Sequence, residues 1–340
     1  MKAIDGDLDE QFDGGVMGDN TYFVADMHDL IIPNESARRI IANTENKIPT
    51  DNELVALYEN CVDPLISAIN DVTCLRKPNE FSTVISLGDM VANRINFGEG
   101  TERSIVGKLA KKAREKNVPQ HEYLLAHIDE NREALQEYAH RNNMWVRLRF
   151  EALQELLGKE TSITFVHMNG NADVFSSLVG KAVLPDEKSP MEIFEESSAV
   201  ERYYKELPGA LVVSDSCGKD SFYLSIPQAL DFNKSIDFLY KLIGFFEVYT
   251  RATEGSLAKI NRDDVCLLIH EALKPDLCAK EQNVEGLETY VLASTIFSPK
   301  YIVHGHTHNA RFIKYNFMGA YVTQIPPNEL ATSDEIFRCF

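Results

Sequence analysis

The sequence lacks any apolar run long enough to cross a membrane. A membrane helix needs about 18 or more consecutive apolar residues with few charges, and none of the runs in the 340 residues approaches this length. The N-terminal stretch MKAIDGDLDEQFDGG also lacks the basic and apolar regions of a secretory signal. We therefore expect no membrane span and a cytoplasmic protein, with a secreted effector that works inside a host as the alternative.

Cysteine is scarce and scattered. The six cysteines form no CxxC pair, which argues against a zinc ribbon and against a dense disulfide framework. None of them is followed by arginine at the sixth position, so a cysteine-dependent phosphatase is not expected either. The thiols fit small, reduced, packed side chains.

Positive charge is also in short supply. Lysine and arginine number 34 against 52 aspartates and glutamates, giving a formal net charge of −18. Nucleic-acid backbones are held mainly by lysine and arginine, so we expect no nucleic-acid partner. An anionic substrate would have to be attracted locally, by metal ions or by a few arginines.

The hydrophobic content of 44% can nevertheless build a large core. Short runs rich in β-branched and aromatic residues alternate with helical patterns, which favours an α/β fold. Strands are predicted over 21–26, 82–89, 162–168, 265–270 and 301–305, with a hairpin in 310–325 that turns at Met318-Gly319. Helices are predicted over 51–72, 102–117, 121–157 with Gly158 as C-cap, and 228–252.

The simplest organisation is one domain with insertions. Residues 1–19 are rich in Gly and Asp and predict a flexible acidic tail. The remaining residues, 20–340, show no internal repeat and no low-complexity linker. Because the helical segment at about 95–158 exceeds what a crossover requires, we expect it to be a cap inserted between two strands.

Metal-ligand residues gather where the predicted strands end. In an Asp-x-His or His-x-His pair at a strand end, both side chains point the same way and can reach one metal or two adjacent metals. Oxygen and imidazole ligands without thiolate favour Mn, Fe, Zn or Mg. The blocks, in chain order, are Asp26-Met27-His28, Gly88-Asp89, Gly170-Asn171, His270, and Gly305-His306-Thr307-His308.

This ordered set of D-x-H, G-D, G-N, H and G-H-x-H resembles the calcineurin-like metallophosphoesterase superfamily, and the resemblance extends from Asp26 to His308. It implies a four-layer α-β-β-α sandwich of two mixed β-sheets with helical insertions. It also implies two divalent metal ions, with manganese expected and iron, zinc or magnesium as alternatives. The resemblance places the first metal on Asp26, His28 and His308, lets Asp89 bridge, and places the second metal on Asn171, His270 and His306.

The block HMNGNAD departs from the family pattern at Ala172. In most of the family this block reads G-N-H-D or G-N-H-E, and its histidine stabilises the phosphate or protonates the leaving oxygen. The aspartate that orients this histidine in the protein Ser/Thr phosphatase branch corresponds to Ala92 of the segment GDMVANR. A positioned general acid contributes roughly 10²–10⁴ in rate, so Ala172 predicts a slow enzyme.

Three interpretations of Ala172 stay open. The alanine is natural and His304, His167 or water supplies the proton; it was introduced to trap substrate; or the chain is a metal-binding pseudoenzyme. His304 is preferred as the substitute acid, with a structural role as its alternative, whereas His167 fits a core histidine better. Arg94 is a candidate phosphate ligand, with an exposed loop arginine as the alternative. The basic run at 108–116 and Arg141, Arg147 and Arg149 are either a solvated helix face or a set that selects an anionic substrate.

The resemblance and these residues predict a phosphatase that acts on a phosphoprotein or a small phosphomonoester. The expected catalytic set is Asp89, Asn171, Arg94 and His304. A nucleotide or cyclic-nucleotide phosphodiesterase is the alternative within the class. A regulatory module that binds metals without turnover is the alternative outside it.

Overall fold

The computed structural model describes residues 20–27, 50–76, 80–90, 105–118, 120–160, 162–196, 210–214, 220–226, 236–237, 239–244, 262–273, 287–307 and 311–337. The predicted tail and most of the predicted helix 228–252 lie outside these residues. No helix in the described ranges is both long and apolar enough to cross a membrane.

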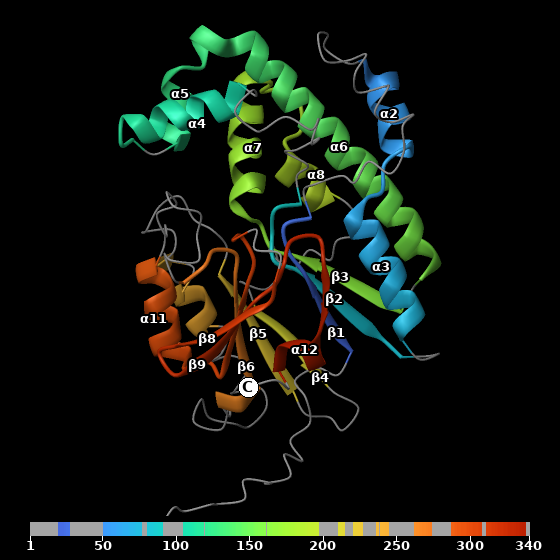
Figure 1. Cartoon of the computed structure of the whole chain (residues 1–340), viewed down its shortest axis with the longest axis vertical. Helices are drawn as coiled ribbons and strands as arrows, with labels where there is room; N and C mark the ends of the chain where they lie inside the picture. Colours follow the sequence, from blue (N-terminus) through green and yellow to red (C-terminus); the bar gives the residue numbers. More distant parts are fainter. Residues whose placement is uncertain are drawn as a thin grey trace, which may run out of the picture.

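Two mixed β-sheets form the centre of the protein (Figure 1). In sheet one the order is β10-β1-β2-β3, with β10 antiparallel to β1 and the other pairs parallel. Its strands are β1 (Thr21–Val24), β2 (Ser82–Ser86), β3 (Ile163–His167) and β10 (Leu330–Thr332).

Sheet two has the order β4-β5-β6-β7-β9-β8. The pairs from β5 to β9 are parallel, and the two outer strands are antiparallel to their neighbours. The hairpin predicted around Met318-Gly319 is confirmed as β8 and β9. The strands are β4 (Ala210–Ser214), β5 (Asp220–Ile226), β6 (Val265–Ile269), β7 (Tyr301–His304), β8 (Ile313–Phe317) and β9 (Ala320–Gln324).

The helices lie mainly on the outer faces of the sheets and above their carboxyl ends (Figure 1). They are α2 (Asp51–Glu59), α3 (Pro64–Leu75), α4 (Ile105–Glu115), α5 (Gln120–Ala126), α6 (Arg132–Lys159), α7 (Asn171–Val183), α8 (Pro190–Glu196), α11 (Leu287–Phe297) and α12 (Ser333–Phe337). Short 3₁₀ turns η2 (Asp129–Asn131) and η4 (Arg262–Asp264) precede α6 and β6.

Alternation of side chains along the strands builds the layers. In β1, Phe23 packs between the sheets with Tyr223 and Val303, while Tyr22 and Val24 point to the other face and meet α3 and α6. The outer face of sheet two packs against residues of the 239–244 segment and of α11. Three apolar clusters therefore separate four layers, and the predicted α-β-β-α sandwich is confirmed.

Two predicted helices are each divided in the structure. The predicted helix 51–72 is two helices, because Asp63 caps a new helix through the backbone N–H of Leu65 and Pro64 occupies its first turn. The predicted helix 121–157 divides into α5, η2 and α6, and Gly158 lies inside the last turn of α6 rather than capping it. An apolar cluster of its own joins α4 and α5 to α6 and α7.

Candidate metal centre

Five predicted ligands lie at the carboxyl ends of parallel strands. Asp26 follows β1, Asp89 follows β2 and Asn171 opens α7 after β3 in sheet one. His270 follows β6 and His306 follows β7 in sheet two. Because strand ends of an α/β sheet point their loops to one edge, residues up to 280 positions apart meet: the His306 backbone N–H donates to Asp26 Oδ2 at 2.7 Å.

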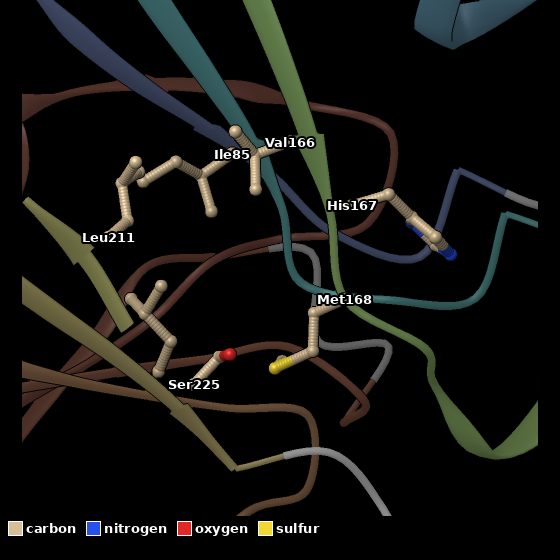
Figure 2. A pocket seen from close by; sticks show the side chains of 7 residues that line it. Ile85, Val166, His167, Met168, Leu211 and Ser225 are labelled. Atoms are coloured by element: carbon tan, nitrogen blue, oxygen red, sulfur yellow. The ribbon is translucent and has the colours of Figure 1, made fainter. Parts of the chain in front are cut away.

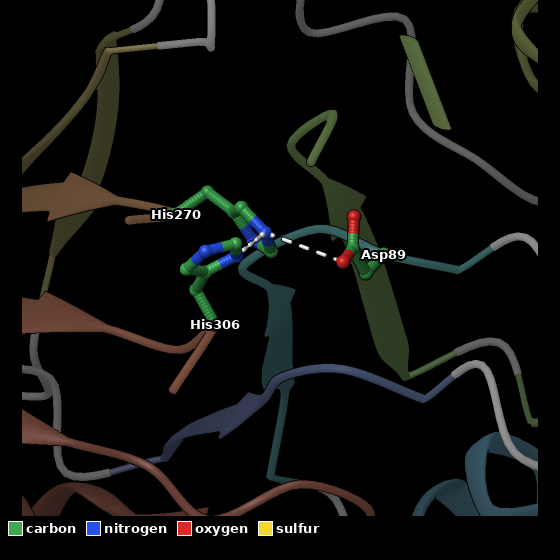
Figure 3. A group of neighbouring side chains, drawn as sticks. All are labelled: Asp89, His270 and His306. Atoms are coloured by element: carbon green, nitrogen blue, oxygen red, sulfur yellow. Dashed lines mark hydrogen bonds and ion pairs between the residues drawn. The ribbon is translucent and has the colours of Figure 1, made fainter. Parts of the chain in front are cut away.

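The donor atoms of this group face one another. Asn171 Oδ1 lies 2.8 Å from His270 Nε2 and 3.0 Å from His306 Nδ1, and the two ring nitrogens are 3.1 Å apart. Asp89 Oδ2 lies 3.4 Å from His270 Nε2 (Figure 3). Asp89, His270 and His306 each offer a ligand atom within 4.8 Å of the others, so this buried group could hold a metal ion.

The tautomer of His270 makes the group electron-rich. Its Nδ1 lies 2.8 Å from the carbonyl oxygen of Leu87, and a carbonyl can only accept, so Nδ1 carries the proton. In a neutral ring the lone pair on Nε2 would then point at the oxygens of Asn171 and Asp89. Electron pairs at these distances repel unless a positive charge lies among them, and a divalent cation is such a charge.

The shifted pKa values of His270 and Asp26 also indicate that this cluster needs a positive charge. Burial by itself lowers the pKa of His270, but the carboxylates of Asp89 and Asp26 more than offset this and raise that pKa to about 10. Burial raises the pKa of Asp26 to about 7; nearby His270 lowers it and the Asp89 charge raises it further. Without a cation, the cluster therefore holds protons in its place.

One carboxylate oxygen of Asp26 is available to bind a metal ion. Its side chain is completely buried, and Oδ2 accepts the His306 backbone N–H. Among the described residues, the other oxygen, Oδ1, is buried without a hydrogen-bond partner. A buried carboxylate oxygen left in this way is costly in an apolar interior, and it fits a metal ligand.

The backbone is strained where the ligands sit. Asp26, Asp89 and His306 have φ values of 52°, 56° and 69°, in the left-handed region that side chains other than glycine seldom adopt. A Cβ added to Gly170 would lie 2.5 Å from the Asp89 nitrogen and 2.8 Å from His270 Cε1. Glycine is required here because the two loops and the imidazole are packed too closely for a side chain.

Asp173 was not predicted as a site residue, yet it holds the loops together. Its completely buried carboxylate accepts the backbone N–H groups of Asp89, Met90 and Gly170, each at 2.9 Å. Asp89 Oδ1 in turn accepts the backbone N–H of Ala172 at 2.7 Å. An acidic residue at the third position of a helix that follows a glycine was the sequence signal for this role.

Three of the predicted site residues, His28, Arg94 and His308, lie outside the described residues, as does Ala92. Their predicted roles stay predictions. The described ligands come from both sheets, and they are those predicted for the second metal together with Asp26 and the bridging Asp89.

The two candidate substitute acids are both engaged elsewhere. His304 is completely buried, and its ring nitrogens lie 2.9 Å from the carbonyl oxygen of Gly305 and from the Tyr315 hydroxyl. His167 borders a small cavity between the sheets (Figure 2) and its Nδ1 lies 3.1 Å from Ser86 Oγ. Burial lowers the pKa of His304 to about 4 and that of His167 to about 3, so both rings stay neutral. This geometry does not favour either as the proton donor.

Helix α6 of the expected cap covers the helix face that carries Ala172. One turn beyond Ala172, Ser176 Oγ lies 3.4 Å from the Tyr138 hydroxyl and accepts from Asn142 Nδ2 at 3.3 Å. Val179, on the same face, packs with apolar residues of α6. Ala172 itself is 8% exposed and lies one helical turn before this contact.

No protein-family model and no curated protein sequence matches this chain. Solved structures do. Phosphopantetheinyl hydrolase from Mycobacterium tuberculosis is 9% identical over 92% of this chain and 91% of its own, with a TM-score of 0.32. The sulfate thiohydrolase SoxB from Thermus thermophilus is 10% identical over 92% and 52%, with a TM-score of 0.38. A candidate 5′-nucleotidase from Staphylococcus aureus is 12% identical over 91% and 48%, with a TM-score of 0.35. Likenesses this distant leave function to be argued from the residues.

Proposed function

We propose that this chain is a dinuclear metal-dependent phosphoester hydrolase of the calcineurin-like metallophosphoesterase type. Its substrate would be a phosphoprotein or a small phosphomonoester. The observation that carries the proposal is the convergence of ligand atoms from Asp89, Asn171 and His270 on one point, in the order of motifs that the family uses. This arrangement is expected of a cation site and is costly in its absence.

Two divalent cations bound there would neutralise phosphoryl oxygens and lower the pKa of a bound water. The proposed ligands of the first metal are Asp26, His28 and His308, those of the second are Asn171, His270 and His306, and Asp89 would bridge. The chain positions these groups through Asp173, which fixes the loop that carries Asp89, and through the Leu87 carbonyl, which fixes the His270 ring.

Ala172 should lower the rate of hydrolysis, because it stands where a histidine would protonate the leaving oxygen. Its methyl group offers no proton to the leaving oxygen, and the candidate acids His304 and His167 are neutral and hydrogen-bonded elsewhere. Aryl phosphates, whose leaving groups need little protonation, should therefore be hydrolysed much faster than alkyl phosphates.

Hydrolysis of an aryl phosphate with Mn²⁺ tests the proposal, with Asp89→Asn as the control that removes the bridging carboxylate. We expect turnover in the parent chain and its loss in the variant. An aryl phosphodiester assayed in parallel separates the phosphatase from the phosphodiesterase alternative. Absence of metal uptake by the parent chain would refute the metal site itself.

The second candidate is a regulatory module that binds metals without turnover, and Ala172 is the residue that favours it. The substitution Ala172→His separates the two. A large gain in turnover would mark a site that lacks only its acid. Metal binding without turnover in both chains would support the module.

A further inference from the structure

A buried arginine of α6 touches the loop that carries Asp89. Arg149 is 1% exposed. Its Nε donates to Asp63 Oδ2 at 2.7 Å, and its Nη1 donates to the carbonyl oxygen of Met90, the residue after Asp89. The sequence had suggested either a solvated face or a substrate-selecting role for this arginine; its burial contradicts the solvated face.

The Met90 backbone is held from both sides. Its N–H donates to Asp173 Oδ1 at 2.9 Å, from α7, and its carbonyl accepts from Arg149, from α6. Asp89, immediately before it, has the left-handed φ of 56°. A strained residue keeps such a conformation only when its surroundings over-determine it, and these two contacts fix the two peptide groups that flank Met90, the residue after Asp89.

The other partner of Arg149 links the same contact to the beginning of α3. Asp63 Oδ1 caps α3 through the backbone N–H of Leu65, and Oδ2 also accepts the Tyr58 hydroxyl at 2.9 Å. Arginine suits this place because its planar fork can serve two acceptors at once, whereas the ammonium of lysine cannot reproduce that geometry. The fork therefore joins α3, α6 and the loop.

The remaining nitrogen of Arg149, Nη2, is buried without a partner among the described residues. A buried unpaired N–H group costs free energy, and replacing a buried ion pair by apolar groups is often neutral or stabilising. Stability alone is thus a weak reason for this guanidinium.

We infer that Arg149 is a positioning residue for the metal loop, defined here as Gly88–Met90. It ties the expected cap to the backbone beside Asp89, so that metal affinity depends on α6. The inference rests on the proposed metal site and assigns Arg149 no contact with substrate.

Titration with Mn²⁺ by calorimetry tests it on Arg149→Lys. Because outer partners of metal ligands typically change metal affinity by about 10–100-fold, we expect a loss of that size in a folded variant. The matched control is Arg76→Lys. It weakens the ion pair between Arg76 and Glu160, which lie at the carboxyl ends of α3 and α6. The control should bind Mn²⁺ as the parent chain does.

Should Arg149→Lys fail to fold, Arg149→Met combined with Asp63→Asn removes both buried charges and retains an oxygen to cap α3; the same loss of affinity is expected. Affinity unchanged in the folded Arg149 variant, or lowered equally in Arg76→Lys, would overturn the inference and leave the proposed function intact. No Mn²⁺ uptake by the parent chain would instead refute the proposed function, and this inference with it.

Discussion

The two sheets contribute chemically different halves of the candidate metal centre. Sheet one supplies oxygen ligands, from Asp26, Asp89 and Asn171, and sheet two supplies the imidazoles of His270 and His306. The oxygen half carries the negative charge of Asp26 and Asp89, whereas left-handed residues and close glycine contacts occur in both halves. Sheet one thus brings negative charge that a cation would neutralise, while the imidazoles of sheet two would complete the coordination of such a cation.

The two halves are also held differently. The loops of sheet one are fixed through their backbone, by the Asp173 carboxylate and the Arg149 guanidinium. On sheet two, the ring of His270 is fixed through its own Nδ1, by a carbonyl oxygen that belongs to sheet one's side. A substitution that displaces the loops of sheet one should therefore also displace the His270 ring of sheet two.

The largest effect is expected for Gly170→Ala. The added Cβ would lie 2.5 Å from the Asp89 nitrogen and 2.8 Å from His270 Cε1, so the loops must separate. Overpacking of this kind typically costs about 1–3 kcal/mol, and Mn²⁺ binding should be lost with it. Denaturant unfolding and calorimetry measure the two effects.

The matched control is Gly180→Ala in the same helix, where an added Cβ meets nothing within 4 Å. It should leave Mn²⁺ binding intact and stabilise the chain by roughly 0.5–1 kcal/mol, because alanine favours the helix. Equal behaviour of the two variants would contradict the close packing described here.

Asp26→Asn should have opposite effects with and without metal. In a chelator at pH 8 we expect the variant to be more stable than the parent by about 1–3 kcal/mol, since the variant lacks a buried charge that His270 only partly offsets. The amide oxygen can still accept the His306 N–H. In Mn²⁺ the variant should gain less stability than the parent, and thermal unfolding in both buffers checks this. A destabilised variant in the chelator would argue against crowded negative charge in the oxygen half.

The metal-free chain should lose stability as pH rises. The folded-state pKa of Asp26 is raised from 3.8 to about 7 and that of His270 from 6.5 to about 10. Both groups bind protons more tightly when folded, so their stabilisation is present below their unfolded values and is lost between about pH 4 and 10. Urea unfolding in chelator measures this slope, which Asp26→Asn should reduce below pH 7. A slope of the opposite sign in the parent–variant difference would contradict it.

The smallest effect is expected for His304→Gln. Because both ring nitrogens of His304 are engaged by Gly305 and Tyr315, turnover should fall far less than the roughly 10²-fold or more that loss of a general acid causes. Steady-state kinetics on an aryl phosphate measures the turnover of His304→Gln against that of the parent chain. A drop of that size with unchanged Mn²⁺ affinity would restore His304 as the proton donor.

The sequence by itself determined much of the fold. Apolar β-branched runs that end in Asp, Asn or His predicted the principal strands and placed Asp26, Asp89, Asn171, His270 and His306 at their ends. That much is local, because strand propensity, alternation and turn residues act over a few positions. The break before Asp63 was missed although its signal is also local, because an N-cap aspartate followed by proline at the first helical position outweighs helical periodicity.

Only the tertiary structure decided which atoms face the centre and which residues hold it. His304 and His306 lie two positions apart, yet the first turns to Tyr315 and the second to Asn171, because the chain changes to a left-handed φ at His306. Arg149 and Asp173 reach Met90 and Asp89 across 59 and 84 positions. Contacts over such separations arise from packing of helices on sheets, and a short-range pattern can mark Asp173 as a helix cap without showing which distant loop it holds.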